Sequence, residues 1–240
     1  MKTNRILLGV ALAFVIYLGI SSFGVFSNIK GSGNVIKESR QVEVFHAIDA
    51  GGAFHITLKQ GDPQQVVVEA DDNIVPIIVT KVHNGVLKIS QKEGAVNAKK
   101  LNIYITVANI DNVDISGACQ LTSDDFFKSN HMEIECSGAA IIDMKLSNKE
   151  LDLDCSGAGK VILEGEAKTM EIEASGASKI DCDKLSSEVV SVNASGASKV
   201  SFVANKLIDI DASGASEVVY QTTNAKVKSE TSGAADITRK

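Results

Sequence analysis

The sequence predicts an all-β protein built as a parallel β-helix, a solenoid with about 19 residues in each coil. Two observations lead to this prediction: a Ser-Gly-Ala tripeptide recurs along the second half of the 240-residue chain, and the residues around it alternate between apolar and polar side chains. Alternation with a period of two is typical of a β-strand that buries one face. A helical solenoid would instead need repeats of about 30 residues or more with a 3.6-residue period, which this chain lacks.

The repeated tripeptide marks a tight corner at the same point of every coil. Its glycines are Gly117, Gly138, Gly157, Gly176, Gly196, Gly214 and Gly233, spaced 18 to 21 residues apart. Glycine can adopt a positive φ angle and has no Cβ to obstruct the coil above, which a tight repeated corner requires. We therefore predict that these glycines are structural and that the serines before them hydrogen-bond at the bend. No histidine shares the phase of the serines, which argues against a row of nucleophiles.

Apolar residues at even spacings from each glycine predict the core. Four residues before the glycines stand Val113, Ile134, Leu153, Ile172, Val192 and Ile210; four residues after them stand Leu121, Ile142, Val161, Ile180, Val200, Val218 and Ile237. At about 3.3 Å per residue, a coil of about 19 residues has a perimeter near 60 Å, which aliphatic side chains can fill. The last coil has Ser229 and Thr231 at inward positions, and this polar surface is expected to limit end-to-end stacking.

Residues 31–110 lack the tripeptide but are rich in predicted strands. Strands are expected at 53–59, 65–70, 77–82, 86–90 and 101–107. His83-Asn84-Gly85 predicts a hairpin between two of them. The run Asp49-Ala50-Gly51-Gly52-Ala53 has the composition of a degenerate corner. This β-rich part is predicted either to form irregular coils continuous with the repeats of residues 111–240 or to be a small antiparallel cap over the first coil.

Residues 1–30 are predicted to be a signal peptide or a membrane anchor with its linker, outside the fold. Lys2 and Arg5 precede an apolar run from Ile6 to Phe26, which is long enough to span a bilayer as a transmembrane helix. Because the positive charges stay inside, both alternatives place the rest of the chain outside the cytoplasm, in the periplasm, envelope or at the cell surface. Gly31-Ser32-Gly33-Asn34 then reads as a short flexible joint.

Several short motifs point to a known family. They are Gly31-Ser32-Gly33-Asn34-Val35, Leu58-Lys59-Gln60-Gly61-Asp62, Asp71-Asp72-Asn73-Ile74 and Gly85-Val86-Leu87-Lys88-Ile89, followed by the Ser-Gly-Ala repeats. Together they resemble the auto-transporter adhesin family with a head GIN domain, over nearly all of residues 31–240. The resemblance implies an exported protein of the kind common in Bacteroidetes, with a right-handed β-helix in the cell envelope. It implies an adhesin-like role and brings no catalytic residues with it.

Carboxylates at outward positions before the corner form a predicted acidic ladder over three consecutive coils. They are Glu133, Glu135, Asp152, Asp154, Glu171 and Glu173. Stacked about 4.8 Å apart, they repel one another unless other charges neutralise them. A partner or a divalent cation such as Ca²⁺ is one source of neutralisation; Lys160, Lys179 and Lys199 just beyond the corner, together with dissolved salt, are the simpler one. The ladder lacks the convergent spacing of a calcium loop, so no metal site is predicted.

The four cysteines are candidates for core residues or for a disulfide. Cys136 and Cys155 share one inward phase in adjacent coils, so their Cα atoms are expected about 5 Å apart, within reach of a disulfide. Their parallel side chains make such a bridge awkward. Buried thiols are the simpler alternative for these two residues and for Cys119 and Cys182.

Composition and charge limit the function. With a net charge of −6 and three arginines, the chain lacks the basic surface that nucleic acid requires. A polysaccharide-degrading β-helix would need paired carboxylates in a cleft with exposed aromatic rings, and only Asp124-Asp125 beside Phe126-Phe127, on an expected loop, offers both. We therefore expect a non-enzymatic structural or interaction module of the cell envelope, with no catalytic residues and no cofactor. Its expected partner is an envelope protein or a glycan; a polysaccharide-binding or polysaccharide-degrading protein is the alternative. The oligomeric state stays open.

Overall fold

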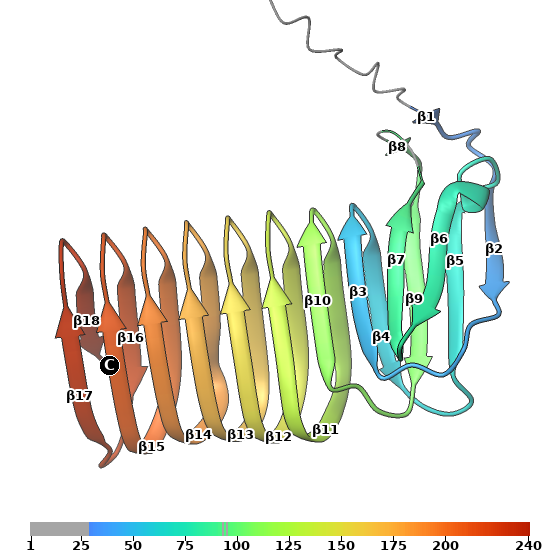
Figure 1. Cartoon of the computed structure of the whole chain (residues 1–240). Coiled ribbons are helices and arrows are strands. Elements are labelled where there is room, and N and C mark those ends of the chain that lie inside the picture. Colours follow the sequence, from blue (N-terminus) through green and yellow to red (C-terminus); the bar gives the residue numbers. More distant parts are fainter. Residues whose placement is uncertain (1–28, 93, 95) are drawn as a thin grey trace, which may run out of the picture.

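The computed structural model describes residues 29–92, 94 and 96–240, and strands make up nearly all of it. The expected parallel β-helix is present as a stack of flattened coils with additional strands at its amino-terminal end (Figure 1). In Figure 1 the front strands run upward, the chain crosses to the back at the corner, and each later coil lies further to the left. The winding is therefore right-handed. The apolar run expected to be a signal or an anchor lies outside the described residues. Within them, no helix has the length and apolarity that crossing a membrane requires.

The regular coils follow the Ser-Gly-Ala repeat. Their strands are β10 (Asn112–Gly117), β11 (Gln120–Cys136), β12 (Ile141–Cys155), β13 (Lys160–Ala174), β14 (Lys179–Ala194), β15 (Lys199–Ala212), β16 (Glu217–Gln221), β17 (Lys226–Thr231) and β18 (Asp236–Arg239). Each long strand starts at one corner, bends at the opposite edge and returns to the next corner. Neighbouring coils pair in parallel, and the pairing register equals the sequence repeat, as in Ile134 opposite Leu153. The inward columns, including Val161 and Ile180, are buried as expected.

The seven corner glycines all have positive φ angles, between 67° and 74°. The amide after each glycine bonds to the corner carbonyl of the preceding coil; Ala158 N, for example, donates to Gly138 O at 2.7 Å. A Cβ on any of these glycines would lie 2.6 to 2.8 Å from that same carbonyl oxygen. Of the serines before the glycines, Ser116, Ser195 and Ser213 donate their hydroxyls to a backbone carbonyl one coil back.

Two further coils precede the repeats, and they are not in chain order. β3 (Ala47–Gly52) and β4 (His55–Gln60) pair in parallel with β10 and β11, so that Gly52 stands at the corner opposite Gly117. On their other side lie β7 (Val86–Gln91), parallel to β3, and β9 (Leu101–Val107), parallel to β4. Along the chain, β3 and β4 therefore come first, although they form the second coil from the capped end. β7 and β9 of the outermost coil follow, and the chain then returns to begin the repeats at β10.

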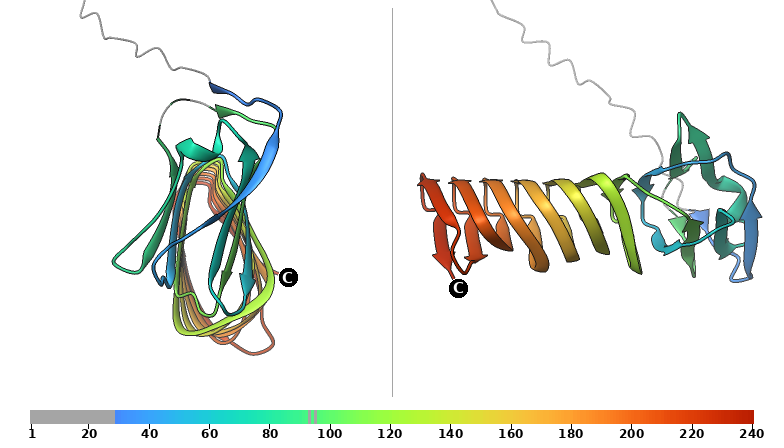
Figure 2. Two further views of the ribbon diagram at one scale, coloured as in Figure 1. Left: turned by 90° about the vertical axis from the view of Figure 1, so that its right-hand side faces the viewer. Right: turned by 90° about the horizontal axis from the view of Figure 1, so that it is seen from below.

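An antiparallel cap covers the amino-terminal end of the solenoid. β6 (Ile78–His83) pairs with β7 through the expected hairpin, and β5 (Gln65–Asp71) pairs with β9 on one edge and with β2 (Val35–Arg40) on the other. A one-turn helix, η1 (Val75–Ile77), and the short pair β1 (Ile29–Lys30) and β8 (Val96–Asn97) complete it. Figure 2 shows these strands closing one end of the rod. The structure thus contains both irregular coils and a cap.

A buried carboxylate ties the cap together. Glu69, on β5, is 7% exposed and accepts hydrogen bonds from the Tyr104 hydroxyl at 2.7 Å, the Asn102 amide at 2.9 Å and the Lys100 ammonium at 3.1 Å. The hydrogen bond from Tyr104 contributes most to lowering the pKa of Glu69, followed by that from Asn102, and the pKa falls from 4.5 to about 2.

This carboxylate gives a prediction for acid stability. Because its pKa is lower in the folded chain, ionised Glu69 stabilises the fold above pH 4.5, and this contribution is lost as the pH falls towards 2. We expect Glu69→Gln to lower the free energy of unfolding by about 2 kcal/mol at neutral pH. Urea unfolding at a series of pH values should show the difference from wild type shrinking as the solution becomes acidic. The exposed Glu43→Gln control should show no such trend, and a difference that is constant with pH would contradict the assignment.

Candidate functional site: the acidic face

The most distinctive surface of the molecule is a sheet face covered by carboxylates, which we call the acidic face. It consists of the outward side chains of the strands that lead into the corner: Asp49, Asp114, Glu133, Glu135, Asp152, Asp154, Glu171, Glu173, Asp209, Asp211 and Glu230. They point outward because the residues between them, such as Ile134 and Leu153, are buried. Parallel pairing then stacks equivalent positions into two straight columns.

The six carboxylates expected from the sequence are brought together. Glu133, Asp152 and Glu171 are register partners in one column, and Glu135, Asp154 and Glu173 are partners in the other. All six line a shallow groove of about 310 Å³. Sequence reasoning missed Asp49 and Asp114, which extend the second column towards the cap. Both stand three residues before a corner glycine, as Glu135 does, so the repeat phase could have found them.

The carboxylates on this face raise one another's pKa. Partial burial is the largest cause for Glu135, and the negative charges of Asp114, Glu133 and Asp154 add to it, so that its pKa lies above the ordinary value. Burial likewise raises the pKa of Asp114, with a further contribution from Asp49 and an opposing one from Lys88. The acidic face therefore carries negative charge that its own surroundings only partly neutralise.

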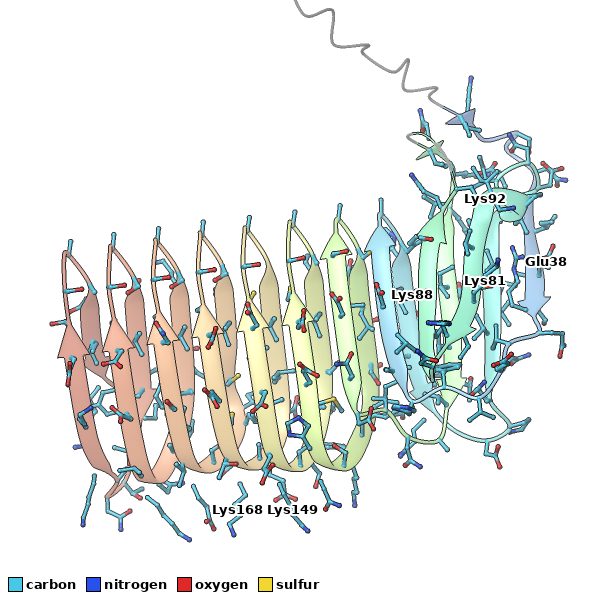
Figure 3. The ribbon with its side chains drawn as sticks, viewed as in Figure 1. Glu38, Lys81, Lys88, Lys92, Lys149 and Lys168 are labelled. Carbon is cyan, nitrogen blue, oxygen red and sulfur yellow. The ribbon has the colours of Figure 1, made fainter. Side chains whose placement is uncertain are left out.

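Basic side chains stand mainly at the ends of the acidic face. Lys88, labelled in Figure 3, bonds to Asp49 at 2.9 Å at the cap end, and this hydrogen bond raises the pKa of Lys88. At the other end Lys228 lies 3.5 Å from both Asp209 and Glu230. Between them, the ring of His131 approaches Asp152 at 3.7 Å.

The three lysines expected to neutralise the ladder do not do so. Lys160, Lys179 and Lys199 form a column of their own on strands that follow the corner. Lys199 pairs there with Glu217 at 2.5 Å, and no ion pair among the described residues joins the three lysines to the acidic face. The corner turns the chain between the two positions, so closeness in sequence does not place them on one surface.

The cysteines, the remaining candidate residues from the sequence, have structural roles. In the described part of the chain, no group of three or more His, Cys, Asp or Glu side chains is arranged to hold a metal ion. Cys119, Cys136, Cys155 and Cys182 are buried free thiols, which answers the question left open for Cys136 and Cys155. Gly159 has no side chain at the point where both of those sulfur atoms pack, since a Cβ there would lie 2.9 and 3.0 Å from them.

The candidate catalytic segment is part of a strand, not a loop as expected. Residues 124–127 belong to β11, where Phe127 is fully buried opposite Leu146 and, of the two phenylalanines, Phe126 is the exposed one. One carboxylate oxygen of Asp125 accepts a hydrogen bond from the backbone N–H of Gln60 at 2.9 Å. Alternation along the strand, which places one ring inside and the other outside, overrides the loop signal of the two aspartates.

Removing one charge from the acidic face is expected to stabilise the protein. Glu135→Gln relieves repulsion with Asp114 and Asp154, and we expect an increase of about 0.5 kcal/mol in the free energy of unfolding near pH 7. Because the folded-state pKa is raised, the carboxylate destabilises the fold above that pKa and ceases to do so in acid. Urea unfolding should show a smaller gain at high salt, where charges are screened. The control Glu43→Gln should change little, and an equal gain in that variant would contradict the explanation.

These observations define the class: a β-solenoid protein with a closed amino-terminal end and one sheet face rich in carboxylates. The family described as "Putative auto-transporter adhesin, head GIN domain" matches residues 44–224, and the chain belongs to this family. The resemblance seen in the short sequence motifs is thereby confirmed. No curated protein matches the sequence.

Solved structures of related shape come from Bacteroides and Parabacteroides species. A "putative adhesin" from Bacteroides fragilis has a TM-score of 0.82 and 24% identity, covering 88% of this chain and 100% of its own. A "putative adhesin" from Parabacteroides merdae has a TM-score of 0.72 and 15% identity, covering 88% and 98%. A "putative lipid binding protein" from Parabacteroides distasonis has a TM-score of 0.74 and 18% identity, covering 88% and 99%. At these identities the likeness shows the fold.

Proposed function

We propose that this chain is a non-enzymatic, adhesin-like module of the cell envelope, located outside the cytoplasm, that presents its acidic face to an envelope protein with basic side chains. The single observation that carries the proposal is the acidic face itself: carboxylates stacked in register in two straight columns, with no basic partner paired to most of them among the described residues. Membership of the adhesin family supports a role in attachment rather than chemistry.

The geometry of the face suits a partner with distributed positive charge. Carboxylates repeat about every 4.8 Å along each column, whereas side chains on one face of an extended segment repeat about every 6.6 Å; long, flexible lysine and arginine side chains can bridge this difference. Each such contact would offset the repulsion that now raises the pKa values of Asp114 and Glu135. Complementary charge on a flat surface also gives fast and selective association.

The test measures binding of the full chain to an immobilised lysine-rich peptide. One variant neutralises the face with Glu135→Gln, Asp154→Asn and Glu173→Gln. A matched control removes the same number of charges elsewhere, with Glu43→Gln, Asp124→Asn and Glu164→Gln. We expect wild type and control to bind at low salt and to lose binding as salt rises, and the face variant to bind at least tenfold more weakly. Equal binding by the face and control variants would overturn the proposal.

A second candidate function, glycan binding, rests on a different groove. This groove of about 590 Å³ lies at the edge opposite the corners and is lined by Asn148, Ser187, Asn205 and Asn224, among others. Asn148 and Ser187 are 7% and 4% exposed. Within the described part of the chain, Asn148 Oδ1 and Ser187 Oγ have no hydrogen-bond partner. Sugar hydroxyls bind to amide and hydroxyl groups of this kind. Binding on a glycan array that is lost in Asn205→Ala, but kept in the face variant, would favour this function.

A further inference from the structure

The two ends of the solenoid differ in how their strands are covered. The cap closes the amino-terminal end, whereas β17 and β18 stand at the other end with no strand paired to their outer edges among the described residues (Figure 1). Every residue of β17 is exposed, including Val227 at 41%. An exposed strand edge offers unpaired N–H and C=O groups to any strand that approaches it.

The known hydrogen bonds show which groups face outward. Ser232 N donates to Ala212 O and Lys240 N donates to Tyr220 O, both towards the preceding coil. Successive residues of a strand direct their backbone groups to opposite sides. The free edge of β17 therefore carries the N–H and C=O groups of Val227 and Ser229, and the free edge of β18 carries those of Ile237 and Arg239.

We propose that this edge pairs with the same edge of a second copy of the chain, which gives a closed antiparallel dimer. The twofold axis passes through Lys228 on β17 and Thr238 on β18. These residues stand five positions before and five positions after the corner glycine Gly233, so they lie at the same height of the flattened coil. One axis perpendicular to both sheets can thus relate both strands to their copies.

Opposite charges face each other on both strands in this register. It places Lys226 opposite Glu230 of the second copy on β17, and Asp236 opposite Lys240 of the second copy on β18. Lys226, Glu230 and Asp236 belong to outward columns, and the Lys240 ammonium lies 3.4 Å from Asp183 within its own chain. If the axis lay one residue further from the corner, Lys226 would face Lys228 instead. Opposite charges across an antiparallel pair stabilise it and like charges destabilise it.

The remaining contacts at the interface are compatible with the pairing. Val227 exchanges both backbone hydrogen bonds with Ser229 of the second copy, and Ile237 does so with Arg239 of the second copy, which is the pattern of β-augmentation. The two Lys228 side chains meet at the axis, but each already lies 3.5 Å from Asp209 and Glu230.

The dimer would be closed and would enlarge the acidic face. Its other ends are the caps, so pairing stops at two copies. A twofold axis perpendicular to the sheet keeps the acidic faces of both copies on the same side. A partner with repeated basic segments would then meet both faces at once, with the gain in avidity that this brings.

Cysteine cross-linking on the axis tests the proposal in the full chain expressed for export. Lys228→Cys and Thr238→Cys each place a thiol opposite its own copy, where Cα atoms of a pair without mutual hydrogen bonds lie about 4.5 Å apart, within disulfide range. Ser191→Cys and Ser201→Cys are matched controls in the same columns, deeper in the stack. We expect a disulfide-linked dimer on non-reducing gels for both axis variants and for neither control. Monomer only from both axis variants, or equal cross-linking of the controls, would overturn the proposal.

Charge exchange gives an independent measurement in the Thr238→Cys background. Lys226→Glu places like charges opposite each other in both halves of the interface and should weaken association about tenfold. Glu230→Lys should do the same. The double exchange Lys226→Glu with Glu230→Lys restores opposite pairing and should recover the cross-linked fraction. A double variant that stays as weak as the single ones would overturn the register.

Discussion

Replacing Gly176 with valine is expected to destabilise the solenoid by about 3 kcal/mol or more. Gly176 has a φ of 70°, a conformation that costs a β-branched residue dearly, and its Cβ would lie 2.6 Å from the carbonyl oxygen of Gly157. That oxygen is backbone and is already bonded to Ala177 N at 2.7 Å. The coil above cannot move aside without breaking the ladder, so urea unfolding followed by circular dichroism should show a much lower midpoint.

Gly33 separates the two causes of this loss. It also has a positive φ, of 86°, but among the described residues no atom lies within 4 Å of the position that a Cβ would take. Gly33→Val therefore tests the backbone strain alone and should cost about 1–2 kcal/mol. If Gly33→Val and Gly176→Val were equally destabilising, contact between stacked corners would not be the reason for the repeated glycine.

Phe202→Ala is expected to cost about 3–5 kcal/mol. Phe202 is fully buried on β15, stands in register between Cys182 and Tyr220, and stacks on the Tyr220 ring with centroids 6.3 Å apart. Truncation would leave a cavity that rigidly hydrogen-bonded coils cannot collapse to fill. Because each coil of a solenoid contacts only its neighbours, the carboxy-terminal coils should unfold first. Hydrogen exchange of residues 199–240 would detect this local loss.

The matched control for this substitution is Phe126→Ala. Phe126 is 44% exposed and contacts the surface beside Lys145, whose ammonium lies 5.8 Å from the ring centroid. We expect a loss of about 1 kcal/mol or less from this truncation. Comparable losses from the two phenylalanines would contradict the assignment of Phe202 to the core.

The regular coils could be derived from the sequence because one short pattern recurs there. The glycine spacing sets the coil length, and the alternation assigns residues such as Ile172 inward and Glu173 outward. In-register parallel pairing then follows, since a shift of one residue would turn every apolar side chain to the solvent. The acidic face was predictable for the same reason, although the degenerate corner at Gly52 concealed its first members.

Other features depend on contacts that no local pattern encodes. The insertion of β3 between β7 and β10, and of β4 between β9 and β11, depends on which strands pair, and long-range pairing leaves no signal in either strand alone. The lysine column illustrates the same limit. Lys160 follows Asp154 by six residues, yet the corner between them places the two side chains on different sheets.

The sequence by itself therefore determined the kind of coil, its length, its buried columns and the stacking of its charges, because in a solenoid each of these is local or repeats with the chain. The tertiary structure alone decided how the amino-terminal end is closed, which basic groups reach the acidic face, and that β17 and β18 are left as an unpaired edge. The physical reason is that strand edges and facing charges are satisfied by distant segments, whose positions are set by the whole fold.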